Sequence, residues 1–292
     1  MLERRHGVTG LSTDAVIPSI GSKELVALLP WLLGLGPGDV VVVPELAYPT
    51  YDVGARLANA QVLAADALTA AGPANVRLVW VNSPANPHGR VLPAEHLAKV
   101  VTWARERDAV VASDECYLDF GWDVQPVSML HPDVCGGSYD GILSLHSLSK
   151  RSNLAGYRAG FVAGDDGLVH QLVDIRKHAG LIVPGPVQAA MVAALDDDAH
   201  VEEQRARYAS RRVVLRNAFT SAGYMVDRSE AGLYLWVTRG EPGRTTLAAL
   251  AELGILVAPG DFYGIAGANH VRVALTATDE RVNAAADRLA VR

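Results

Sequence analysis

A lysine, two serines and an arginine that could bind a carbonyl compound and an anion lie close together in the sequence. Lys150 ends the run Ser147-Leu-Ser149-Lys150, which begins two positions after the apolar stretch 142–145, and Arg158 follows eight residues later. An isolated lysine is usually a solvated surface charge. A lysine at the end of a strand, among hydroxyls and glycines, can instead form a Schiff base with a carbonyl group. The run therefore indicates a candidate nucleophile at Lys150.

Polar residues also follow two earlier apolar runs. Asp114-Glu115-Cys116-Tyr117 comes directly after 110–113, and NSPANPHG, from Asn82 to Gly89, follows 78–81. Aspartate is rarely buried without a partner, so Asp114 favours a site over core packing. The Asn82–Gly89 segment by itself is typical of a turn. Loops at the carboxyl ends of parallel strands, however, are where such sheets bind ligands. Metal binding is a competing role for Asp114, but no cluster of histidines or cysteines supports it.

A possible anion site precedes all of these residues. Gly21-Ser22-Lys23-Glu24 follows a strand-like run and opens a helical pattern. Free N–H groups and the helix dipole make such an N-terminus attractive to anions. A plain helix start with Ser22 as the cap is the simpler interpretation of this segment alone.

The elements that must position these residues alternate along the first 165 residues. Short runs rich in β-branched residues predict buried parallel strands at 15–20, 40–43, 78–81, 110–113 and 142–145. Amphipathic stretches between them predict helices at 22–33, 50–58 and 93–107, the last with Pro93 in its first turn. This alternation predicts an α/β fold with a mostly parallel sheet.

The alternation of short apolar runs and amphipathic stretches ends after about Pro186, where VPGP at 183–186 interrupts helical patterning. We therefore expect a large domain at 1–186 and a smaller C-terminal α+β domain at 187–292. The expected helices of the smaller domain are 197–221, 245–253 and 279–289, and its expected strands are 233–237, 255–257 and 271–275. At the other end, Leu2–His6 is typical of the last turn of a helix closed by Gly7.

Composition excludes several classes of protein. Half of the 292 residues are apolar, which argues against a disordered chain. Lys and Arg number 26 against 32 Asp and Glu, a formal charge of −6, which argues against a nucleic-acid partner. Two cysteines build no disulfide framework, so we expect a cytoplasmic protein. The most apolar stretch, 25–38, is shorter than the roughly 20 residues of a spanning helix, and the N-terminus has no apolar signal-peptide region.

Taken in order, these segments resemble a known family. GSKE, AYPTY, NSPANPHG, SDECY, SLSK with Arg158, PGDFYG and HVRVALT occur in the order found in the class I/II aminotransferases. These enzymes use pyridoxal 5′-phosphate (PLP) and have fold type I. The resemblance extends from about Gly7 to the end of the chain. Asn86, Asp114, Lys150 and Arg158 are separated by 28, 36 and 8 residues, as the family's signature requires.

The resemblance implies a role for each matching residue. Lys150 would bind the cofactor covalently and move a proton at the substrate. Asp114 would pair with the pyridine nitrogen and keep it protonated. Tyr117 and Asn86 would donate hydrogen bonds to the ring oxygen O3′, and Tyr48 would stack on the ring.

The same resemblance implies two anion sites. The cofactor phosphate would lie at the start of the Ser22 helix, where Ser22 and Lys23 offer main-chain N–H groups. Ser147, Ser149 and Arg158 would add side-chain contacts to that phosphate. Arg272 would clamp the substrate α-carboxylate from the small domain, with Asn86 as a second substrate-binding residue, so substrate binding could bring the two domains together.

Two departures from the family pattern stand out. His88 occupies a place in NPHG where threonine is usual, which the loop should tolerate because its chemistry lies in Asn86 and in the proline–glycine shape. Family members also begin several dozen residues earlier, with an arm that grips the partner subunit, a glycine loop and a tyrosine donated across the dimer. The chain is therefore expected to be a fragment, a sequence with a mis-assigned start or a shortened homologue, and to bind PLP less tightly than an N-terminally extended version and turn over little.

Within the family, the chain looks most like the succinyldiaminopimelate aminotransferases of actinobacteria. The segments that suggest this are PELAYPTYDVGARLA, LHSLSK, RKHAG and PGDFYG. The resemblance implies a homodimer that transfers an amino group from glutamate to N-succinyl-2-amino-6-oxopimelate, without a metal, nucleic acid or membrane partner. The alternatives are an aminotransferase for aspartate, aromatic amino acids or histidinol phosphate, or a PLP-binding protein with little turnover.

Overall fold

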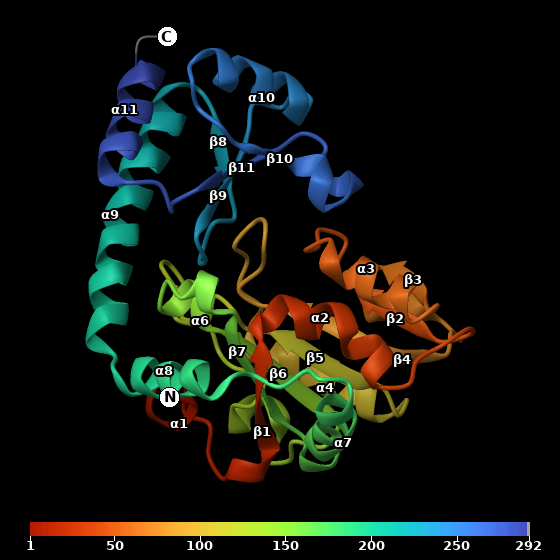
Figure 1. The fold of residues 1–292 in the computed structure, drawn as a ribbon. Coiled ribbons are helices and arrows are strands. Elements are labelled where there is room, and N and C mark those ends of the chain that lie inside the picture. The colour runs from red at the N-terminus through yellow and green to blue at the C-terminus, as the bar shows by residue number, and fades with distance from the viewer. Residues whose placement is uncertain (291–292) are drawn as a thin grey trace.

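The computed structural model describes residues 1–290 as two layered units joined by a long helix (Figure 1). The larger unit is built on a seven-stranded sheet in the order β1-β7-β6-β5-β4-β2-β3. Its strands are β1 Val16–Ile20, β2 Val40–Val43, β3 Gln61–Ala64, β4 Val76–Asn82, β5 Val110–Asp114, β6 Ile142–Ser147 and β7 Ala159–Gly164. Its main helices are α2 Gly21–Leu32, α3 Thr50–Leu57, α4 Ala94–Arg105, α7 Asp166–His178 and α8 Gly185–Asp196.

The sheet is mostly parallel, as the sequence predicts, but the parallel pairing predicted for β1 is wrong. β2 to β6 pair in parallel. β7 runs antiparallel to β6, and β1 pairs only with β7, antiparallel to it. The run 15–20 was therefore predicted with the wrong pairing. β7 was not predicted, because AGFVAG is rich in alanine and glycine and lacks the β-branched signal.

Helices cover both faces of this sheet, as a buried parallel sheet requires. α2, α3 and α7 bury Leu25, Tyr51 and Leu172 against one face. α4 and α8 bury Leu97 and Met191 against the other, together with the short helix α1, Leu2–His6. Gly7 closes α1 with φ 65°, which confirms the expected helix end.

The smaller unit is an antiparallel sheet with helices packed against it. Its strands, in the order β10-β11-β9-β8, are β10 Ala258–Pro259, β11 Val271–Ala274, β9 Tyr234–Thr238 and β8 Met225–Asp227. Two of its helices are α10 Gly243–Glu252 and α11 Asp279–Ala290. The strand predicted at 255–257 is wrong, because no strand forms there. Leu256 is 91% exposed, and pairing with β11 begins only at Ala258.

The long helix α9, Ala199–Ser221, runs along one side of the molecule from α8 to α11 (Figure 1). Its Leu215 and Phe219 lie in the core of the smaller unit. Met191 of α8, in contrast, lies in the core of the larger unit. The boundary near residue 186 stays a prediction, and this packing favours a position between α8 and α9.

Candidate active site

All the residues selected from the sequence line one pocket of about 350 Å³ between the two units. They are Ser22, Lys23, Tyr48, Asn86, Asp114, Tyr117, Ser147, Ser149, Lys150, Arg158 and Arg272. Asn82, Cys116, Ala155 and Tyr234 complete the lining. The carboxyl ends of β4, β5 and β6 deliver Asn82, Asp114 and Ser147 to this edge, as the parallel pairing of these strands requires.

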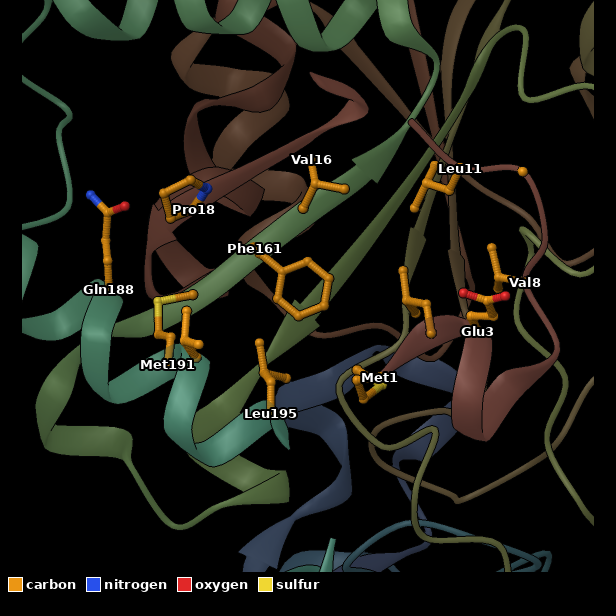
Figure 2. A pocket seen from close by; sticks show the side chains of 13 residues that line it. Met1, Glu3, Val8, Leu11, Val16, Pro18, Phe161, Gln188, Met191 and Leu195 are labelled. Carbon is orange, nitrogen blue, oxygen red and sulfur yellow. The ribbon is translucent and has the colours of Figure 1, made fainter. Parts of the chain in front are cut away.

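A larger pocket of about 410 Å³ lies elsewhere, between α1, β1, β7 and α8 (Figure 2). Apolar side chains such as Val16, Phe161 and Met191 form its walls, and Glu3 is its one ionisable side chain. It brings together neither a nucleophile nor a pair of titratable side chains, so chemistry is assigned to the smaller pocket.

Asp114 is a buried carboxylate of the site held by two hydrogen-bond donors. It is 6% exposed, and its carboxylate accepts hydrogen bonds from the Tyr51 hydroxyl at 2.8 Å and from the Cys116 N–H at 3.3 Å. Burial raises the pKa of Asp114, while these donors and the Lys150 charge lower it. A cationic N–H group placed in the pocket would stabilise the charged carboxylate further.

A buried amide holds the neighbouring loop in place. Asn82 Nδ2 donates to the Asp114 carbonyl at 2.9 Å, and Asn82 Oδ1 accepts from the Asn86 N–H at 2.7 Å. This fixes the turn that presents the Asn86 side chain. Asn82 is thus a positioning residue that sequence reasoning quoted only as the start of the motif.

The start of α2 is open to an anion. Its N-cap is Ile20, not Ser22, whose side chain caps no N–H group of the helix, while the Glu24 carboxylate accepts from the Ile20 N–H at 3.2 Å. Gly21 has φ 70°, and a Cβ built there would overlap the Arg158 guanidinium. Glycine is therefore what lets Arg158 approach the first N–H groups of the helix. Ser147, at the N-cap of the adjacent short helix α6, Leu148–Arg151, accepts from the Ser149 N–H at 3.2 Å.

The smaller unit contributes a cation. Arg272 of β11 lies 3.9 Å from the Tyr234 ring centroid and donates to Asn86 Oδ1 at 2.9 Å. Its Nε is buried without a hydrogen-bond partner, and no carboxylate of residues 1–290 forms an ion pair with it. A ligand carboxylate would satisfy both the charge and the free donor.

Two tyrosines join the units beside this arginine. The hydroxyls of Tyr117 and Tyr234 share a hydrogen bond at 3.0 Å. Burial and the neighbouring hydroxyl raise the pKa of Tyr117 well above its usual value, so its phenol stays protonated as a donor. Sequence reasoning missed Tyr51, Cys116 and Tyr234; Tyr51 was within the quoted AYPTY motif, but Tyr234 lay in an ordinary apolar run.

The comparisons with known proteins agree with this geometry. The sequence profile of "Aminotransferase class I and II" matches residues 1–289. The chain belongs to this family. It is 66% identical over 288 residues to a probable aminotransferase of Mycobacterium tuberculosis, covering 99% of this chain and 69% of that protein. It is 60% identical to the 4-dedimethylamino-4-oxo-anhydrotetracycline transaminase OxyQ of Streptomyces rimosus, covering 99% of this chain and 80% of that protein.

Solved structures agree as well. A probable N-succinyldiaminopimelate aminotransferase from Thermus thermophilus superposes with a TM-score of 0.86 at 27% identity, covering 98% of this chain and 80% of that one. The protein is therefore an aminotransferase with the PLP-dependent transferase fold type I. Its cofactor is PLP, and its substrates are amino acids and 2-oxo acids.

The residues present fit that cofactor. The uncapped start of α2, with Arg158 beside it, forms an anion cradle, and Asp114 is a buried acceptor for a ring N–H. In residues 1–290 no helix is long and apolar enough to cross a membrane, and no three metal-binding side chains cluster.

Proposed function

We propose that this aminotransferase moves the amino group of glutamate to N-succinyl-2-amino-6-oxopimelate, acting as a cytoplasmic homodimer in diaminopimelate and lysine synthesis. The observation that carries the reaction type is the convergence of Lys150, Asp114 and the unpaired Arg272 in one pocket. The acceptor is supported by the family resemblance and by the similarity to the probable N-succinyldiaminopimelate aminotransferase of Thermus thermophilus.

The residues divide the work as follows. Arg272 binds the substrate α-carboxylate and sets the orientation of the bond to the α-hydrogen. Bound PLP supplies an electron sink for breaking that bond. Asp114 would accept a hydrogen bond from the ring N–H, and Tyr117 and Asn86 would provide hydrogen bonds at the pocket wall. The Lys150 amine would take the proton from the substrate α-carbon and deliver it to carbon C4′ of the cofactor.

A second acceptor class has its own support. The 60% identity to the Streptomyces rimosus transaminase favours a bulky polycyclic ketone. Acceptors for aspartate, aromatic or histidinol-phosphate aminotransferases are the remaining alternatives.

Half-reaction assays distinguish these acceptors. The enzyme is first converted to its amino form with glutamate, and each oxo compound is then added while the spectrum is followed. We expect the highest kcat/KM with N-succinyl-2-amino-6-oxopimelate. If a polycyclic ketone or oxaloacetate returns the enzyme from its amino form to its starting spectrum faster, that result would overturn this choice of acceptor but not the aminotransferase assignment.

The role of Lys150 has a separate test. Lys150→Ala, mixed with PLP and desalted, should show no protein-linked visible absorption, whereas Lys177→Ala, which removes an exposed lysine paired with Asp174 on α7, should keep it. A Lys150→Ala protein that kept the visible band after desalting, and kept a covalently attached pyridoxyl group after borohydride reduction of that band, would show that another amine is the nucleophile. Light scattering of the wild-type protein tests the homodimer.

A further inference from the structure

The three residues after Lys150 all bind, through their side chains, to α9, to Asp198 just before it or to the end of α8. Arg151 donates to the Ala194 carbonyl at 2.7 Å and to Asp198 at 2.8 Å. The Ser152 hydroxyl is 2.9 Å from His200 Nε2. Asn153 donates to Gln204 at 3.2 Å and accepts from the Tyr208 hydroxyl at 3.2 Å.

These partners form a stripe on one face of α9. His200, Gln204 and Tyr208 are four residues apart, and side chains at that spacing lie above one another on a helix. The turn 151–153 therefore lies along the helix rather than touching it at one point. We call this set of hydrogen bonds the α9 clasp.

The inner end of the clasp is buried and charged. Arg151 is 3% exposed and lies 3.4 Å from Asp119, which also accepts from Arg5 at 2.8 Å. Burial alone would raise the pKa of Asp119, but His6, Arg5 and Arg151 lower it to about 2. Asp119 is two residues after Tyr117, so the same charges also anchor the segment that carries this pocket residue.

The far end of α9 belongs to the smaller unit. Leu215 and Phe219 pack in its core, and α11 lies alongside (Figure 1). A 23-residue helix is roughly 35 Å long and nearly rigid. The clasp thus links the backbone next to Lys150, over the length of this helix, to the unit that carries Arg272.

We propose that the α9 clasp is a positioning device for Lys150. It fixes the turn after the lysine to α9, so that the position of the smaller unit, and of Arg272 on it, sets where the amine points. The proposal rests on the assignment of Lys150 as the cofactor lysine. The order Ser152–His200–Asp197 also matches a hydrolytic triad, but the Arg151 guanidinium donates to the Ser152 hydroxyl at 3.3 Å, which occupies that oxygen as a tether.

The test uses variants that loosen the outer part of the clasp and leave its buried arginine intact. Asn153 has φ 54°, so Asn153→Gly keeps the backbone geometry while deleting two hydrogen bonds. It is combined with His200→Ala. Arg207→Ala, which removes an exposed ion pair with Glu203 on the same helix, is the matched control.

Two measurements on the PLP-loaded protein decide the outcome. The pH midpoint of the visible band should shift in the double variant, because the lysine no longer keeps its orientation. The single-turnover rate with glutamate should fall by roughly tenfold while the glutamate Kd stays the same, since a small misplacement slows the reaction without weakening binding. Arg207→Ala should match the wild type. Combining Asn153→Gly with His200→Gln in place of His200→Ala should recover part of the rate.

A wild-type midpoint and rate in the double variant would overturn the proposal. If the double variant does not fold, Ser152→Ala deletes the two hydrogen bonds of that hydroxyl, to His200 and from Arg151, without removing a charged side chain, and an unchanged midpoint there would also overturn it. Failure of the cofactor assignment itself is distinguishable, because Lys150→Ala would then keep its chromophore.

Discussion

The Arg272 guanidinium of the smaller unit donates a 2.9 Å hydrogen bond to the Asn86 side chain of the larger unit. The bond joins two residues that line the pocket, and it brings a cation that pairs with no carboxylate of residues 1–290 next to the loop that follows β4. We propose that substrate attaches to both residues, one on each unit, which is the arrangement needed for a ligand to draw the two units together.

Arg272→Ala should weaken the binding of 2-oxo acids and dicarboxylate analogues and spare PLP. Loss of a buried charge-assisted pair typically costs on the order of 2–5 kcal/mol. Inhibition constants for a dicarboxylate measure this loss. Arg244→Ala is the control, since it removes an exposed pair with Asp261 in the same unit and should change binding by less than about 1 kcal/mol.

Asp114→Asn should leave PLP bound and reduce kcat severely, because a neutral amide no longer keeps a ring nitrogen protonated in the transition state. Absorbance titration measures PLP binding, and steady-state kinetics measure kcat. A variant with near-normal kcat would show that Asp114 is a structural carboxylate.

Tyr51→Phe tests the role of Asp114 by removing one of its hydrogen-bond donors and leaving the carboxylate in place. Burial already raises the pKa of Asp114, and the Tyr51 hydroxyl is one of the groups that lower it. Removing the hydroxyl should raise that pKa further, so the acidic limb of the pH–kcat profile should move to higher pH. Tyr139→Phe, which deletes a surface hydroxyl bonded to the Thr9 carbonyl, should leave the profile unchanged.

Gly21→Ala should reduce the affinity for PLP. An alanine there adopts φ 70° at a cost of about 1–2 kcal/mol and pushes the Arg158 guanidinium from the helix start. Gly34→Ala shares the positive φ, at 75°, but its Cβ meets nothing within 4 Å. Both variants should lose thermal stability, and only Gly21→Ala should show a higher Kd for PLP; equal Kd values would argue against the anion cradle.

His146 should make the folded protein sensitive to acid. Burial lowers its pKa to about 3. The unfolded chain takes up a proton near pH 6.5, which the folded chain does not accept until far lower pH, so stability falls as pH drops. The loss is about 1.4 kcal/mol per pH unit, or about 2 kcal/mol between pH 6.5 and 5.

Urea unfolding of the cofactor-free protein at those two pH values measures this slope. His146→Gln should reduce the loss of unfolding free energy between pH 6.5 and pH 5 by about 2 kcal/mol. His88, whose pKa burial lowers to about 4, adds a similar slope that remains in the variant. His170→Gln, at an exposed position on α7, should leave the slope as in the wild type.

Part of the site was readable from the sequence because it depends on where short apolar runs end. Runs that become β4, β5 and β6 stop next to Asn82, Asp114 and Ser147, and parallel pairing alone brings their ends to one edge. The start of α2 was readable for a similar reason, since a helix terminus exposes its N–H groups wherever the helix packs. What these positions do was supplied by the resemblance to a family, not by their spacing.

Tertiary structure decided what local pattern does not encode. Tyr51 and Asp114 are 63 residues apart, and Tyr117 and Tyr234 are 117 apart, so their hydrogen bonds exist only once the layers have packed. The antiparallel pairing of β1 depends on β7, whose small residues give no strand signal. The packing of α8 on the large sheet is equally invisible in VPGP, because burial depends on which surface the chain meets and local periodicity specifies only that a surface is apolar.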